Sequence, residues 1–220
     1  MFRYVLFDLD GTLTDPKTGI TSCVQYALAD AGIEEPDLDK LEPFIGPPLA
    51  DSFREFYGFD DEQIKRAIDK YHERFDQKGI FENEIIEGIP ELLKALKDAG
   101  RRVSIASSKP RPLVIRILEH FEIAQYFDTV VGSEFDGRFA TKEAVVEEAL
   151  RQLVPSVYEK EDVAMVGDRK FDIQGARAHG LTGIGVSFGY AGEHELEDAG
   201  SDYIVDTVEE LQRLLLQGCL

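Results

Sequence analysis

The spacing of apolar residues changes once along this chain, near Gly88. Between residues 16 and 82, apolar side chains recur three or four positions apart, which is the spacing of one helix face. The first set predicts a helix that begins at Thr21 or Ser22 and is stopped by Gly32. The apolar positions that mark three predicted helices are Val24, Ala27, Leu28 and Ala31; Leu49, Phe53 and Phe56; and Ile64, Ile68, Tyr71 and Phe75. We therefore expect an all-helical segment whose aromatic side chains, including Tyr57, form its core.

Short apolar runs outside this segment alternate with helical patterns. Strands are predicted at residues 3–7, 102–107, 128–132, 162–168, 183–188 and 202–205. Helices are predicted at residues 89–100, 111–121, 142–153 and 171–180, and a last helix opens at the capping box T-V-E-E of residues 207–210. This alternation is typical of the α/β class, with helices packed on a doubly wound parallel sheet.

A long helical insertion separates the first two predicted strands. The first strand ends at Asp8, yet the next comes only near residue 103, and a crossover connection needs far fewer residues. The sequence therefore predicts an α/β core domain of residues 1–15 and 83–220, with a small helical cap domain of residues 16–82 at the carboxyl edge of the sheet. Hinges near Pro16 and Asn83 would let the cap close over a bound substrate.

Composition excludes several classes of partner. The 220 residues include 43 acidic and 24 basic side chains, a formal net charge of −19, which repels nucleic acids and anionic membranes. No apolar run is long enough to span a membrane, and the first residues, MFRYVLFDLD, lack the features of a secretory signal, which predicts a cytoplasmic location. Cys23 and Cys219 are far apart, so neither a disulfide nor a zinc site is expected. A monomer and a homodimer both remain open.

Polar residues of chemical interest follow several of the predicted strands. Asp8 and Asp10 follow the first strand, and Asp168 and Asp172 follow a later one. The other residues at such positions are Ser107, Ser108 and Lys109 after the second strand, and Lys142 at the start of a helix. Open α/β sheets bind ligands beyond the carboxyl ends of their strands. Carboxylates that converge there repel one another unless a cation lies between them, and Mg²⁺ suits such oxygen ligands. The sequence therefore predicts a Mg²⁺ site.

The first acidic pair has a spacing that separates two roles. Asp8 and Asp10 are two residues apart on an extended segment, so their side chains point to the same side. One carboxylate can attack a substrate atom while the other moves protons. Gly11 allows a sharp turn that brings N–H groups against an anion, and the hydroxyl of Thr12 can fix that turn.

Four segments, in chain order, resemble the motifs of the haloacid dehalogenase superfamily. The first is DLDGTLTD at residues 8–15, directly after a hydrophobic strand. The others are VSIASSKP at 103–110, which includes Ser107, then Lys142, and MVGDRKFD at 165–172. The helical insertion after the first motif, together with SSKP and with FIGPPL at 44–49, is similar to the phosphoglycolate phosphatase-like branch of that superfamily.

The resemblance implies a Mg²⁺-dependent phosphatase that acts on a small phosphorylated metabolite in two steps. Asp8 would attack phosphorus and become an aspartyl phosphate, while Asp10 would protonate the leaving alkoxide and later take a proton from water. Asp168 would bind Mg²⁺ with Asp8 and the backbone carbonyl of Asp10. Asp172 would orient Lys142 or a metal-bound water, and which of Asp168 and Asp172 lies closer to the metal is left open.

Further residues are expected to contact the substrate. The candidate phosphate-binding residues are Gly11, Thr12, Ser107, Ser108 and Lys142. Gly46 and Pro47 lie in a rigid loop between two predicted helices, and this loop could either read the rest of the substrate or simply connect the helices. Arg54, on the following helix, could reach a substrate anion.

Other functions fit part of the same pattern. A sugar phosphomutase of the β-phosphoglucomutase type differs in the lifetime of its aspartyl phosphate, which spacing does not report. A phosphonate hydrolase would need a cap lysine, and the cap has several. A protein that only binds a phosphate ligand is a further alternative. A dehalogenase needs neither Asp10 nor a metal, and a signalling receiver has no insertion after its first strand, which argues against both. Phosphoglycolate, nucleoside 5′-monophosphates and sugar phosphates all remain open as substrates.

Overall fold

The structure, a computed structural model of the chain, describes residues 2–154, 159 and 162–218. Cys23 is buried, and Cys219 lies outside the described residues. The chain divides into two compact units, one formed by Met1–Thr14 with Ile85–Leu220 and the other by Asp15–Glu84. The corresponding ranges expected from the sequence are 1–15 with 83–220, and 16–82. Each unit is described by itself below.

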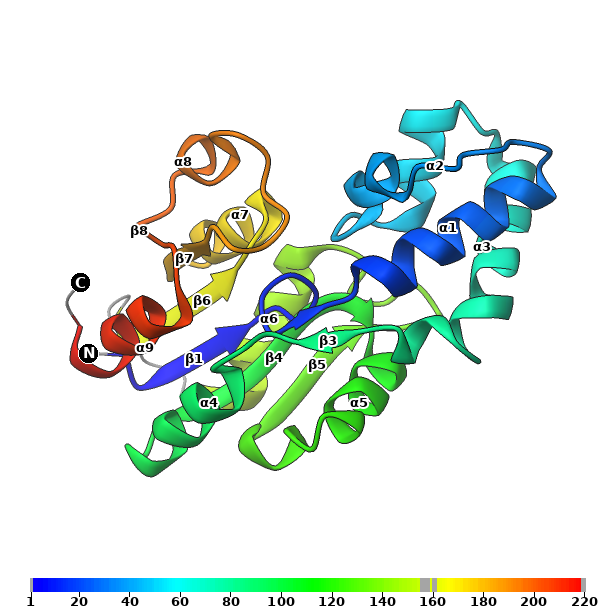
Figure 1. Cartoon of the computed structure of the whole chain (residues 1–220). Helices are drawn as coiled ribbons and strands as arrows, with labels where there is room; N and C mark the ends of the chain where they lie inside the picture. The colour runs from blue at the N-terminus through cyan, green and yellow to red at the C-terminus, as the bar shows by residue number, and fades with distance from the viewer. Residues whose placement is uncertain (1, 155–158, 160–161, 219–220) are drawn as a thin grey trace. The chain divides into compact units, whose positions relative to one another are not determined.

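A parallel sheet forms the centre of the first unit (Figure 1). Within the described residues it has six strands in the order β5-β4-β1-β6-β7-β8, and each strand is parallel to its neighbours. The strands are β1 Tyr4–Phe7, β4 Arg102–Pro110, β5 Thr129–Ser133, β6 Val163–Gly167, β7 Thr182–Val186 and β8 Tyr203–Val205. Since the order runs outward in both directions from β1, the predicted doubly wound parallel sheet is confirmed.

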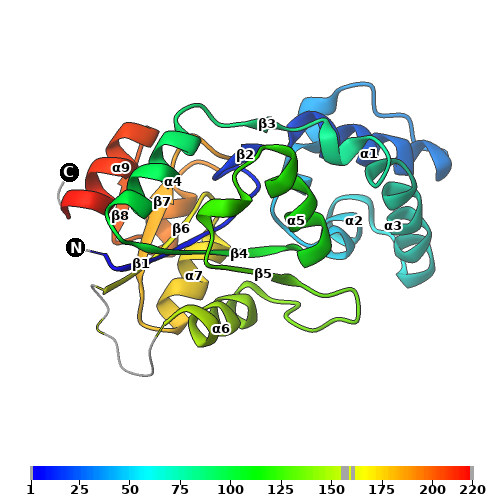
Figure 2. The ribbon, with the colours of Figure 1, turned by 90° about the horizontal axis from the view of Figure 1, so that it is seen from below.

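Helices cover both faces of this sheet (Figure 2). The view shows α4, α5 and α9 on one side and α6 and α7 on the other, and α8 packs against α7. Their bounds are α4 Ile89–Asp98, α5 Arg111–His120, α6 Lys142–Leu153, α7 Lys170–Ala178, α8 Glu195–Ala199 and α9 Val208–Gln217, with the short helix η3 at Ala124–Tyr126. Val5, Leu6 and Phe7 of β1 are fully buried, as a central strand covered on both faces must be. None of the helices in the described residues is both long and apolar enough to cross a bilayer.

The start of α9 differs in one detail from the sequence-based expectation. Thr207 caps the helix, because its Oγ1 accepts the N–H of Glu210 at 3.1 Å. The carboxylate of Glu210, however, accepts the N–H of Asp206 at 2.9 Å. The return bond of the predicted capping box therefore goes to the N–H of Asp206, one residue before the expected N–H of Thr207.

The second unit consists of helices and their connections. These are α1 Lys17–Asp30, η1 Leu38–Phe44, α2 Leu49–Tyr57, α3 Asp61–Phe75 and η2 Gly79–Phe81, and the segments that join this unit to the first pair as a two-stranded sheet of β2 Thr14–Asp15 and β3 Glu84–Ile85. Helix α1 begins at Lys17, earlier than the predicted Thr21 or Ser22. Its first turns pack tightly on η2, since a Cβ on Gly19 would lie 2.1 Å from the carbonyl oxygen of Gly79.

Aromatic side chains form much of the core of the second unit. Phe53, Tyr71 and Phe75 are buried, as predicted. Phe56 does not follow the prediction, because 45% of it is exposed while one side of its ring contacts Phe44, with 5.5 Å between ring centroids. It therefore covers the edge of the aromatic core instead of filling it.

Candidate active site

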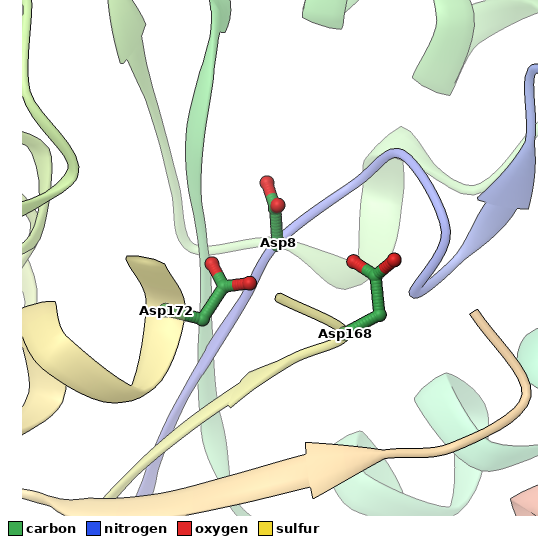
Figure 3. A group of neighbouring side chains, drawn as sticks. All are labelled: Asp8, Asp168 and Asp172. Carbon is green, nitrogen blue, oxygen red and sulfur yellow. The ribbon is translucent and has the colours of Figure 1, made fainter. Parts of the chain in front are cut away.

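Three carboxylates meet at the carboxyl edge of the sheet in the first unit (Figure 3). Asp8 follows β1, Asp168 follows β6, and Asp172 lies in the first turn of α7. Among the described residues these three form a group in which one oxygen from each lies within 4.8 Å of the others, and all three side chains are buried. The structure thus brings together three of the residues singled out in the sequence.

The register of the sheet explains why these carboxylates meet. Phe7 lies opposite Val166, and the N–H of Asp8 donates to the carbonyl oxygen of Val166 at 2.9 Å. The two strands therefore end at the same level. Gly167 then allows α7 to start very close to the strand end, since a Cβ there would lie 2.1 Å from Cγ of Asp172.

Lys142 connects two members of this cluster. Its Nζ lies 3.0 Å from Oδ1 of Asp8 and 2.7 Å from Oδ1 of Asp172, and it donates to the carbonyl oxygen of Ala106 at 3.0 Å. Burial opposes the charge of this ammonium, but Asp172 and Asp8 outweigh burial and raise the pKa of Lys142. Gly175 of α7 makes room for the lysine stem, because a Cβ there would lie 3.1 Å from Cγ of Lys142. Lys142 is therefore a fixed positive charge beside Asp8.

Asp10 has a cation of its own. Nζ of Lys109 donates to Oδ2 of Asp10 at 2.6 Å, and the two side chains are 8% and 12% exposed. Burial raises the pKa of Asp10, and the nearby Lys109 offsets part of that rise. The other oxygen, Oδ1, is buried and has no hydrogen-bond partner among the described residues. Asp10 is thus held at one oxygen, while the other is available to a ligand.

Asp168 is held by two neutral donors. The hydroxyl of Thr12 donates to its Oδ1 at 3.3 Å, and the backbone N–H of Tyr190 donates to its Oδ2 at 2.8 Å. Burial, followed by the charges of Asp172 and Asp8, raises the pKa of Asp168 well above its usual value. A cation beside this carboxylate would relieve that cost.

The turn after Asp10 is closed by its own backbone hydrogen bonds and fits tightly against Asp168. Gly11 has φ +78°, and a Cβ on it would lie 2.2 Å from Oδ2 of Asp168. The N–H of Gly11 donates to the carbonyl oxygen of Thr14 at 2.7 Å. The N–H of Thr12 donates to the carbonyl oxygen of Leu9 at 3.2 Å. The N–H groups of Gly11 and Thr12 are therefore used inside the turn, and the glycine allows the close approach of Asp168. A role for Gly11 and Thr12 in phosphate binding stays a prediction.

The remaining predicted residues are less closely linked to the carboxylates. Ser107 is buried at the end of β4, where its Oγ accepts the N–H of Lys109 at 3.3 Å, and the carbonyl oxygen of Ser108 accepts the hydroxyl of Ser133 at 2.8 Å. Gly46, Pro47 and Arg54 belong to the second unit. Nη2 of Arg54 lies 2.8 Å from Oδ1 of Asp61, and both side chains are exposed. A role for these three residues in substrate binding stays a prediction.

The charges at this edge of the sheet fit a divalent cation. Four carboxyl groups, those of Asp8, Asp10, Asp168 and Asp172, gather around two ammonium groups, those of Lys109 and Lys142. Both oxygens of Asp172 already have partners in the protein, because one lies 2.7 Å from Nζ of Lys142 and the other accepts the N–H of Arg169 at 3.0 Å. Asp168 meets no side-chain cation in these contacts. Among the two candidates, this difference favours Asp168 as the metal ligand and Asp172 as the residue that holds Lys142.

Two contacts of the site were not predicted. Lys109 was noted after the serines of the second strand, but its side chain was given no role. The sequence did not indicate that the loop after β7 contacts Asp168. The donor is the backbone N–H of Tyr190, and the pattern of side chains does not reveal a backbone donor. The position of that loop next to a strand end is the only feature that could have indicated it.

The chain is similar to known proteins in both sequence and fold. The sequence model of the haloacid dehalogenase-like hydrolase family matches residues 5–186. A 5′-nucleotidase of Pseudomonas aeruginosa is 47% identical over 193 residues, which cover 87% of this chain and 86% of that protein. The tyrosine-protein kinase PtkA of Mycobacterium tuberculosis is 38% identical over 216 residues, 97% of this chain and 72% of that one. The crystal structure of a predicted phosphatase from Clostridium acetobutylicum has a TM-score of 0.92 and 46% identity, with 99% of both chains covered.

Proposed function

The chain belongs to the haloacid dehalogenase-like hydrolases and is a phosphatase, and from this premise we propose that it hydrolyses a small phosphate monoester with Mg²⁺ through an aspartyl phosphate. The observation that carries the proposal is the environment of Asp8. This buried carboxylate ends the central strand, lies 3.0 Å from the ammonium of Lys142, and shares a cluster with Asp168. Such a setting suits a nucleophile that must approach a phosphate dianion.

The reaction divides between the two carboxylates of the first loop. An oxygen of Asp8 forms a bond to phosphorus while the bond from phosphorus to the leaving oxygen breaks, and Asp10 gives that oxygen a proton. Water then attacks phosphorus, Asp10 takes the proton from that water, and Asp8 is released with inorganic phosphate. Burial raises the pKa of Asp10, which favours the protonated form that the first step requires.

Two further side chains act on the phosphoryl group. Lys142 offsets its negative charge, because the ammonium already lies beside the attacking carboxylate and is kept there by Asp172. The hydroxyl of Ser107, buried at the end of β4, donates a hydrogen bond to a phosphoryl oxygen.

Asp8 and Asp168, with the backbone carbonyl of Asp10, are the residues that would hold Mg²⁺. When bound, the ion neutralises charge between the carboxylates and the phosphate oxygens. The four carboxyl groups at this edge outnumber the two ammonium groups, which supports this assignment.

Phosphate release from a panel of small monoesters tests the proposal. The panel is measured with Mg²⁺, with EDTA, and with the Asp8→Asn variant, whose fold is checked by circular dichroism. We expect release that EDTA and Asp8→Asn both abolish. Phosphate release by the Asp8→Asn variant would contradict an aspartyl-phosphate intermediate. Phosphate release in the presence of EDTA would contradict the need for a metal ion.

Nucleoside 5′-monophosphates are the proposed substrate class. Their support is the relative named a 5′-nucleotidase, which is 47% identical and matches 87% of this chain. In the same panel we expect nucleoside 5′-monophosphates to have the highest kcat/KM, ahead of phosphoglycolate and sugar phosphates. A sugar 1-phosphate that is isomerised without phosphate release would favour a mutase. Loss of activity on borohydride treatment with a phosphonate substrate would favour the Schiff-base chemistry of a phosphonate hydrolase.

Closure of the second unit over the substrate is a separate proposal. Its hinges would lie near Pro16 and Asn83, next to the paired strands β2 and β3. Hydrogen exchange of the amides around these residues should slow when a phosphate analogue binds. Equal exchange with and without the analogue would argue against closure at these positions.

A further inference from the structure

The loop between β7 and α8 contacts the metal-side carboxylate through its backbone. The N–H of Tyr190 donates to Oδ2 of Asp168 at 2.8 Å. Gly189 fits against the same residue, since a Cβ on it would lie 2.3 Å from Cβ of Asp168 and 2.5 Å from the carbonyl oxygen of Gly11. This loop, together with the hydroxyl of Thr12, therefore orients Asp168.

Glu195 ties the far end of this loop to the residues that follow Asp168. Its Oε1 accepts Nε of Arg169 and the backbone N–H of Lys170, each at 2.9 Å. Its Oε2 accepts the backbone N–H of Gly192 at 3.0 Å. The side chains of Glu195 and Arg169 are both 13% exposed, so solvent weakens this pair less than it weakens a surface ion pair.

These contacts close a ring of hydrogen bonds around the carboxylate. Arg169 and Lys170 come directly after Asp168 in the chain, and Gly192 comes two residues after Tyr190. Glu195 thus binds both the segment after Asp168 and the loop that carries Tyr190. The distance between these two segments determines the hydrogen bond from Tyr190 to Asp168.

We propose that Glu195 is a positioning residue for the divalent metal site, acting through the loop of residues 187–195 on the orientation of Asp168. This proposal rests on the metal site of the proposed function, and it goes beyond it by assigning that site a supporting residue that contacts neither metal nor substrate. Residues that orient ligands in this way commonly change metal affinity by about 10–100-fold when mutated. Because Glu195 acts one step further out, we expect about 3–10-fold.

Direct Mn²⁺ binding, followed by electron paramagnetic resonance without substrate, tests the proposal. The variants are Glu195→Gln and Glu195→Ala. Glutamine keeps an acceptor for Arg169 and Lys170 but presents a donor to the N–H of Gly192, so it breaks one side of the ring, whereas alanine breaks both. We expect weaker Mn²⁺ binding in the order wild type, Glu195→Gln, Glu195→Ala. Glu197→Gln on the same helix, which removes an exposed charge, should bind Mn²⁺ like the wild type.

The outcomes separate this proposal from the proposed function. Equal Mn²⁺ affinity of the wild type and both Glu195 variants, with only their melting temperatures lowered, would reduce Glu195 to a structural role and overturn the proposal. Absence of Mn²⁺ binding in the wild type would overturn it as well. If the wild type binds Mn²⁺, loses it with Asp168→Asn and weakens with the Glu195 variants, yet hydrolyses no monoester, then the phosphatase mechanism fails while the role of Glu195 stands.

Discussion

Nζ of Lys109 lies 2.6 Å from Oδ2 of Asp10, in a contact where neither side chain is more than 12% exposed. The carboxylate proposed to give and take the proton is therefore anchored by a cation that lies on a different strand. This contact fixes the direction of Asp10, and it also counteracts the effect of burial on the pKa of Asp10. Both effects can be measured.

Lys109→Met should lower kcat by about 10-fold or more, because general acid–base catalysis depends on a carboxylate that is held at the correct place. KM should change little if Lys109 acts on Asp10 and not on the substrate. Steady-state kinetics with the best monoester measure both constants. Lys94→Met, which removes an exposed lysine of α4, is the matched control and should leave both unchanged. A rise in KM at constant kcat would instead make Lys109 a substrate ligand.

The pH dependence of Lys109→Met should also shift. Burial raises the pKa of Asp10 and Lys109 lowers it, so removal of the lysine raises that pKa further. Hydrolysis of the aspartyl phosphate needs ionised Asp10, and the ionised fraction is lost as the pH falls through the pKa. The acid limb of the kcat profile is therefore expected at higher pH in the variant than in the wild type. Superimposable acid limbs would show that the lysine does not control this proton.

Asp168→Asn should stabilise the metal-free protein at neutral pH. Burial, followed by Asp172 and Asp8, raises the pKa of Asp168 in the folded state. Stability linked to such a group is fully present below the unfolded pKa and is lost as the pH rises through the folded pKa. Removing the charge should raise Tm with EDTA by about 2–4 °C for each kcal/mol recovered. The metal-free wild type should likewise melt higher at mildly acidic than at neutral pH.

Mg²⁺ supplies the control for that prediction. The ion should raise the Tm of the wild type, because it binds the folded state, and should leave that of Asp168→Asn nearly unchanged. Asp198→Asn removes an exposed acidic side chain of α8 and should alter neither value. A metal-free Asp168→Asn protein that melts below the wild type would show that the hydrogen bonds of this carboxylate outweigh its repulsion by Asp172 and Asp8.

Lys142→Met should be both inactive and strongly destabilised. The substitution leaves Asp8 and Asp172 buried without the ammonium between them, and breaking a buried ion pair in this way costs about 3–5 kcal/mol. Urea unfolding gives the free energy of unfolding, and phosphate release gives activity. Lys65→Met, at a side chain that is 79% exposed, is the control for loss of one lysine. If the two variants unfold at the same urea concentration, Lys142 does not hold the cluster together.

Gly11→Ala and Gly100→Ala form a matched pair. Both glycines have positive φ, +78° and +72°, so alanine is strained by about 1–2 kcal/mol at either position. Only at Gly11 would the new Cβ also collide, 2.2 Å from Oδ2 of Asp168, whereas nothing lies within 4 Å at Gly100. Gly11→Ala should therefore weaken Mn²⁺ binding beyond its effect on Tm, and Gly100→Ala should lower Tm alone. Equal Mn²⁺ binding by the two variants would contradict the collision.

The carboxylate cluster was predictable because each of its members follows an apolar strand or opens the helix after one. Parallel topology then brings strand ends to one edge without any knowledge of side-chain conformation. The pairing of Lys109 with Asp10 was not predictable in this way. The register between β4 and β5 shifts between Ser107 and Pro110, so alternation along the strand does not tell where Lys109 points.

The sequence did not predict two features, the start of α1, which depends on packing, and helix α8, which is very short. The first turns of α1 contain Gly19, which is buried by its close approach to η2, and a glycine carries no apolar signal. Helix α8 spans the five residues Glu195–Ala199, which is too short to show a helical period. Its first residue nevertheless makes the contacts on which the proposed support of Asp168 depends.

The place of β1 in the chain has a consequence for biosynthesis. This apolar strand leaves the ribosome before its partners β4 and β6, which begin only at Arg102 and Val163. The residues of the second unit, Asp15–Glu84, are all synthesised before either partner exists. A nascent chain can therefore collapse its helical unit early, while the strand that carries Asp8 waits unpaired and open to chaperones and to aggregation. Assembly of the sheet edge that gathers Asp8 and Asp168 is thus a late event in the making of this protein.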